Sequence, residues 1–224
     1  MAIAGQAYAA ADPMSSPVQH IWSLSVQGQI FVGLPLLLLS VRWLLGRLGL
    51  RPEQTRRALV WLVAGTAGAS LLYAVVGVGL HQNFTYFDTG ARVWEYLAGT
   101  LVAVAASSVR LPARLGAALG WVGLIMILIT GVVLDARATF PGVQALLPIA
   151  GAVLIVVSGI GAPAGRGVTT RRVLGWPPLA AAGGYAYEFY LWHWVVLVFA
   201  LAATGRDSFG WLAGSVVLLV SGIA

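Results

Sequence analysis

Three short segments of the chain carry polar side chains inside an apolar sequence, and the first begins at His20. On a helix, His20, Ser23 and Gln27 share one face, while Trp22 and Gln29 share another. An imidazole beside a hydroxyl and an amide can accept a proton from a hydroxyl substrate, or position that substrate by hydrogen bonding. The structural alternative is an anchor at the membrane interface. We expect a site that faces a cavity at the outer leaflet.

The second polar segment runs from Tyr86 to Glu95. Asp88 or Thr89 can cap the helix that follows. Arg92 and Glu95 are three residues apart and can form an ion pair. The structural interpretation is a charge-neutralised helix start. The functional interpretation is that Glu95 orients a substrate or a catalytic imidazole.

The third polar segment runs from Tyr185 to Trp194 and places Glu188 and His193 within an apolar helix. Ionisable groups inside spans are costly, and they usually mark function or face a cavity. His81, beside an expected outer loop, is interpreted as an ordinary interface residue. The three histidines lie on three different segments and cysteine is absent, so no metal site is expected.

The composition shows which kind of protein must position these groups. Of 224 residues, 59% are apolar and 9% are charged, whereas soluble domains are about 25% charged. The mean hydropathy is +0.89. A soluble core with a polar shell and a disordered chain are both excluded. The thirteen arginines are therefore assigned to loops of a polytopic membrane protein, and no nucleic-acid partner is expected.

Apolar stretches of about 20 residues predict an all-α bundle with about six full spans and a truncated seventh. The six lie near residues 27–46, 58–80, 94–109, 115–134, 143–161 and 178–203. The seventh begins near Trp211 and is still apolar at Ala224. Because the chain starts in a polar loop and ends within a span, we expect it to be the carboxy-terminal part of a longer protein.

Arginine placement predicts the orientation, because short cytoplasmic loops hold the excess of basic residues. Ten arginines fall in one set of loops and three in the alternate set. Loops 47–57 and 162–176 are therefore expected to be cytoplasmic, and the loop at 81–93 extracytoplasmic. Residues 1–19 are expected to form an extracytoplasmic loop, followed by a membrane domain over 20–224. Some of the ten arginines could also bind a phosphorylated donor.

Four ordered segments resemble acyltransferase family 3, a family of integral membrane acyltransferases. His20 to Phe31 is similar to H-x-W-S-L-x-V-E-x-Q-F, with Gln27 where Glu is usual. Tyr86 to Gly99 is similar to Y-F-x-x-x-x-R-x-W-E-x-L-A-G. A segment like F-P-G follows at 140–142. Tyr187 to Trp194 is similar to Y-x-x-Y-L-W-H-W.

This resemblance implies a bacterial plasma-membrane enzyme that moves an acyl group, often acetyl, from cytoplasmic acyl-CoA to a hydroxyl of an extracytoplasmic glycan or lipid-linked acceptor. Acyl-CoA is then a donor substrate, with no bound cofactor. His20 and Glu95 are the candidate catalytic residues, and the family's basic His and Arg motif would lie upstream of Met1. The candidate substrate-binding residues are Trp22, Ser23, Gln27, Arg92, Glu188 and His193.

Two other functions stay open on the sequence alone. A transporter or flippase-like subunit could use Glu95, Glu188 and His193 to relay protons or line a glycan path. Such transporters often contain internal repeats, and the sequence shows none. A non-catalytic truncated product is the other alternative.

Overall fold

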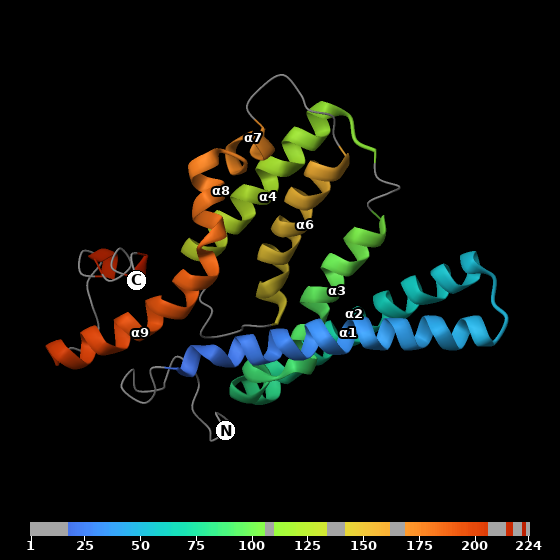
Figure 1. The fold of residues 1–224 in the computed structure, drawn as a ribbon, viewed down its shortest axis with the longest axis horizontal. Helices are drawn as coiled ribbons and strands as arrows, with labels where there is room; N and C mark the ends of the chain where they lie inside the picture. Colours follow the sequence, from blue (N-terminus) through green and yellow to red (C-terminus); the bar gives the residue numbers. More distant parts are fainter. Residues whose placement is uncertain are drawn as a thin grey trace. The chain divides into compact units, whose positions relative to one another are not determined.

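A computed structural model describes residues 18–105, 110–133, 142–161, 169–205, 214–216 and 221–222 of the chain (Figure 1). Within these ranges the chain forms helices and no β-strand. The longer helices are α1 (Trp22–Arg47), α2 (Pro52–Phe87), α3 (Thr89–Ala105), α4 (Ala113–Val133), α6 (Leu146–Gly161) and α9 (Ala186–Thr204). The shorter ones are η1 (Gln19–Ile21), η3 (Val143–Ala145), α7 (Thr170–Leu174) and α8 (Pro177–Gly184). The predicted all-α membrane fold class is confirmed.

Five of the described helices are long and apolar enough to cross a bilayer. Their apolar segments are Trp22–Arg47, Pro52–Gln82, Ala113–Val132, Val143–Ile160 and Ala186–Thr204. Large apolar side chains point outward on these helices, for example Trp61, which is 76% exposed, and Val132, which is 87% exposed. Such a surface is unfavourable in water and suits hydrocarbon. The expected span at 94–109 falls on α3, of which the structure describes 17 residues. The expected seventh span falls mostly outside the described residues.

Two predicted elements differ from the structure, the loop at 81–93 and the span at 178–203. α2 continues to Phe87 through a kink at His81, so most of the expected loop at 81–93 is helical. The hydroxyl of Thr85 donates to the carbonyl of His81 at 3.0 Å, which supports the turn after the kink. The predicted span at 178–203 is wrong as a single helix. Tyr185, with φ −94° and ψ 6°, separates α8 from α9.

The chain divides into two compact units, which we describe separately. The terminal unit comprises residues 1–25 and 174–224, and the central unit comprises residues 26–173. In the central unit, α2 packs on α3, and α4 packs on α6. Its buried core contains Ala74 from α2, Ala91 and Trp94 from α3, and Ala145 from η3.

Helices α4 and α6 lie side by side (Figure 1), and their backbones approach closely at two glycines. A Cβ atom built on Gly123 would lie 2.5 Å from the carbonyl oxygen of Gly151, and one on Gly151 would lie 2.8 Å from that of Gly123. Both distances are too short for a side chain. Small residues permit such close packing in membranes, where no hydrophobic force drives helices together. Gly123 and Gly151 therefore set the α4–α6 distance.

Candidate functional site

In the terminal unit, His20 lies in the short helix η1, which directly precedes α1, and is only 3% exposed. Three aromatic side chains of α9 surround its ring. The ring centroids lie 5.3 Å from Tyr190, 5.8 Å from His193 and 6.3 Å from Trp194. Two imidazoles that are about 170 residues apart in sequence thus lie next to each other. The predicted site residues His20 and His193 are brought together.

One hydrogen bond joins the backbone of His20 to Tyr190 of α9, and a second joins the Ser23 side chain to the same tyrosine. The Tyr190 hydroxyl donates to the His20 carbonyl oxygen at 2.5 Å. The Ser23 and Tyr190 hydroxyl oxygens are 2.6 Å apart. Because the single Tyr190 hydrogen is directed at His20, Ser23 is the donor in that second bond. We call His20, Ser23, Tyr190 and His193 the histidine group.

His193 has a defined tautomer in this arrangement. Its Nδ1 lies 3.1 Å from the carbonyl oxygen of Phe189, one turn earlier on α9. A carbonyl oxygen can only accept, so Nδ1 carries the proton in that bond. In a neutral ring, Nε2 is then the acceptor. The Phe189 ring stacks on the imidazole with a centroid distance of 5.7 Å and restricts its rotation. His193 can therefore accept a hydrogen bond or a proton at Nε2.

The hydrogen bonds of the histidine group given above do not include Trp22, Gln27 or Glu188. Trp22 is half-buried at the first residue of α1. Gln27 is half-buried on α1 within the central unit. Glu188 is exposed in the first turn of α9, and among the described residues it forms no recorded hydrogen bond or ion pair. Its predicted role in binding stays a prediction.

In the central unit, the predicted pair of Arg92 and Glu95 is present. Arg92 Nε lies 2.9 Å from Glu95 Oε1, and the two side chains are 19% and 10% exposed. Both residues lie in α3, so Arg92 belongs to a helix and not to the loop in which the arginine count placed it. An ion pair lowers the cost of keeping either charge in a membrane. The Arg92–Glu95 pair therefore places a carboxylate and a guanidinium side by side near the start of α3.

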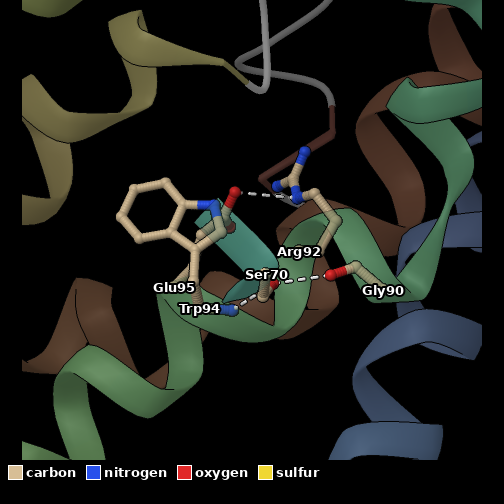
Figure 2. Close-up of polar contacts among 5 residues, drawn as sticks. All are labelled: Ser70, Gly90, Arg92, Trp94 and Glu95. Atoms are coloured by element: carbon tan, nitrogen blue, oxygen red, sulfur yellow. Dashed lines mark hydrogen bonds and ion pairs between the residues drawn. The ribbon is translucent and has the colours of Figure 1, made fainter. Parts of the chain in front are cut away.

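A hydroxyl from α2 is inserted into the first turn of α3 (Figure 2). Ser70 Oγ donates to the Gly90 carbonyl oxygen at 2.6 Å and accepts from the Trp94 backbone amide at 3.1 Å. Gly90 and Trp94 are the acceptor and donor of one regular i→i−4 helical bond. Such an insertion fixes the local direction of a helix. Ser70 therefore positions the turn of α3 that carries Arg92 and Glu95.

The cap of α3 also agrees with the sequence. Asp88 Oδ1 accepts from the backbone amide of Gly90 at 2.7 Å, which confirms the predicted N-cap. Its other carboxylate oxygen accepts from the Tyr73 hydroxyl at 2.5 Å. The Thr89 hydroxyl donates to Gln29 Oε1 on α1 at 2.8 Å. The start of α3 is thus attached to both α1 and α2.

The structure groups the predicted residues into two clusters. His20, Ser23 and His193 belong to the terminal unit, whereas Arg92 and Glu95 belong to the central unit. The described part of the chain contains no cluster of three or more side chains able to hold a metal ion. The histidine group offers hydroxyls and imidazole nitrogens, which suit proton transfer and hydrogen bonding to a hydroxyl substrate.

Two residues of these clusters were missed by the sequence analysis. Tyr190 is three residues before His193 and so shares its helix face, a spacing that could have indicated it. Ser70 could have been indicated only weakly, because it is a polar residue within the apolar sequence of α2. Which partner it contacts depends on how α2 packs on α3.

Comparison with known proteins adds independent findings. A family model described as an acyltransferase domain matches residues 3–224. A Bacillus subtilis (strain 168) protein named "Putative peptidoglycan O-acetyltransferase YrhL" is 24% identical over 191 residues. That match covers 82% of this chain and 29% of the relative, so the chain spans less than a third of the relative's length. No solved structure matches.

Proposed function

The chain belongs to the acyltransferase 3 family of membrane proteins, and from this membership we propose that it takes part in moving an acyl group onto a hydroxyl of a cell-envelope glycan. The name of the Bacillus subtilis relative supports acetyl as the group and peptidoglycan as the acceptor class. A lipid-linked glycan precursor carries the same hydroxyl chemistry. The multi-pass membrane location fits an acceptor of the envelope.

The chemistry needs a proton acceptor and a precise position for the acceptor hydroxyl. The hydroxyl oxygen forms a bond to the acyl carbon and loses its proton, the thioester C–S bond breaks, and the departing thiolate takes up a proton and leaves as the thiol. We propose acyl-CoA as the thioester donor and the cytoplasm as its source. The arginine-rich loops support this direction, because arginine suits phosphate groups.

The observation that most supports a role in acceptor binding is the histidine group. His20 is held through its backbone carbonyl by Tyr190, so its ring has a fixed place next to His193. We propose that the His20 ring positions the acceptor hydroxyl and that His193 Nε2 accepts a hydrogen bond from the acceptor. Preorganised groups of this kind contribute to rate because their orientation is fixed before the reaction. Arg92 and Glu95 are proposed as a second polar contact for substrate.

A chemical analysis of the envelope tests this function. The gene is deleted in its host, and ester-linked acyl groups are released from purified envelope glycan by mild alkali, which leaves N-acetyl amides intact. We expect the deletion to lose a class of ester-linked acetate and the intact wild-type gene to restore it. Membranes supplied with radiolabelled acetyl-CoA test the donor in the same strains. If neither ester content nor label incorporation depends on the gene, the proposal is wrong.

A further inference from the structure

A cavity of about 570 Å³ lies in the central unit, and its lining includes no residue of either polar cluster. Its walls come from the second half of α1, the first turns of α2 and the last turns of α3. Small-molecule sites have volumes of about 300–1,000 Å³. The cavity is therefore large enough for part of a bound molecule.

Two arginines from different helices line this cavity. Arg42 comes from α1 and Arg56 from α2, and both are exposed. Neither guanidinium forms an ion pair with a carboxylate among the residues that the structure describes. Glu53 also lines the cavity and is its one carboxylate. Arg47 and Arg51 lie beside the connection between α1 and α2, so positive charge predominates there.

The rest of the lining is mainly apolar. Leu59 and Val63 of α2, and Leu101 and Val104 of α3, contribute branched side chains. Water molecules find few hydrogen-bonding partners against these apolar side chains. The cavity thus combines two cationic side chains with apolar walls. This combination matches a molecule with a phosphate at one end and a hydrocarbon chain at the other.

We propose that this cavity binds an anionic phospholipid, with its phosphate between Arg42 and Arg56 and one acyl chain against Leu59, Val63 and Leu101. Arginine binds phosphate through two parallel hydrogen bonds. Basic pockets between membrane helices are known binding places for acidic lipid headgroups. Acyl-CoA also carries phosphate, but its nucleotide needs polar contacts, and beyond the two arginines only Glu53, Thr55 and Thr100 supply polar side chains here.

Native mass spectrometry of the purified protein tests the proposal. The delipidated protein is titrated with phosphatidylglycerol and, separately, with phosphatidylcholine of the same chains. We expect one phosphatidylglycerol molecule to remain bound at collision energies that remove phosphatidylcholine. The double variant Arg42→Gln/Arg56→Gln should weaken phosphatidylglycerol binding by about tenfold or more. The control Arg57→Gln/Arg110→Gln removes the same charge from residues that do not line the cavity, and should bind like the wild type.

A second variant and a competitor make the outcome decisive. Leu101→Trp fills the apolar part while both arginines remain, and it should also reduce phosphatidylglycerol binding. Equal loss in the cavity and control variants would mean general surface charge and would overturn the proposal. Displacement of the lipid by acetyl-CoA, with loss of acetyl-CoA binding in Arg42→Gln/Arg56→Gln, would assign the cavity to the donor instead. Lipid binding is measured without reference to acyl transfer, so this test is independent of the proposed function.

Discussion

The side-chain hydroxyl of Tyr190 donates a hydrogen bond of 2.5 Å to the backbone carbonyl of His20, 170 residues earlier in the chain. The bond joins the last long described helix to the short helix η1. Ser23 donates to the same tyrosine oxygen and completes the connection. Through these contacts α9 determines where the His20 imidazole lies.

Tyr190→Phe removes this hydroxyl while keeping the ring. We expect the variant to lower acyl transfer about tenfold, because the position of His20 is no longer fixed. A net loss of about 1 kcal/mol in stability is typical for one hydrogen bond, so the protein should still accumulate. Tyr187→Phe is the control, since Tyr187 is exposed on the same helix. Equal activity of the two variants at equal membrane levels would rule out the positioning role.

Arg92 and Glu95 allow a test by a double-mutant cycle. Arg92→Gln leaves a carboxylate without its ion-pair partner in a membrane helix, and we expect a stability loss of about 3 kcal/mol. The double variant Arg92→Gln/Glu95→Gln removes both charges and should recover most of that loss. If the pair also contacts substrate, the double variant will be stable yet poorly active. Thermal denaturation in detergent and ester analysis measure the two effects. Additive stability losses would show that the two charges do not interact.

The α4–α6 packing predicts opposite effects of one substitution at two glycines. Gly151→Ala places a methyl group 2.8 Å from a backbone carbonyl that cannot move aside, so we expect a loss of about 1–3 kcal/mol. Gly131→Ala, on α4, meets no atom within 4 Å. It should be neutral or stabilising, because alanine favours helices by about 1 kcal/mol over glycine. Melting temperatures of the purified variants check this, and equal shifts would contradict the packing.

Orientation stays a prediction that labelling can decide. The arginine distribution predicts that Thr169 faces the cytoplasm and Gln82 the exterior. The chain has no cysteine, so single cysteines at these positions give an unambiguous signal. An impermeant maleimide should label Gln82→Cys in intact cells, and Thr169→Cys only after the membrane is permeabilised. The reverse pattern would invert the topology and remove the support for a cytoplasmic donor.

Fold class could be predicted from the sequence because it depends on hydropathy, which is a local property. Helix ends were predicted less well. α2 extends beyond its apolar run at both ends because Pro52 and Gln54 start it early and Thr85 supports its last turn. These are polar interactions that a hydropathy profile does not detect. The break at Tyr185 follows Gly183 and Gly184, and the hydropathy profile does not detect it because apolar residues continue on both sides.

The site could be predicted in part. Polar residues in apolar segments identified His20, His193, Arg92 and Glu95, and two residues three apart on a helix predicted the ion pair. The contact between His20 and His193 could not be predicted, because it depends on how η1 meets α9. Ser70 was missed because its role exists only once α2 packs on α3.

His20→Ala, made in the gene at its own locus, tests the central claim most directly. Ester-linked acetate on the envelope glycan is measured at matched levels of membrane protein. A role of His20 in positioning the acceptor predicts a loss of roughly 100-fold in transfer. His20→Gln keeps a hydrogen-bond donor and should recover part of that loss. Near-wild-type acetylation in His20→Ala would contradict the claim and would leave His20 a structural role only.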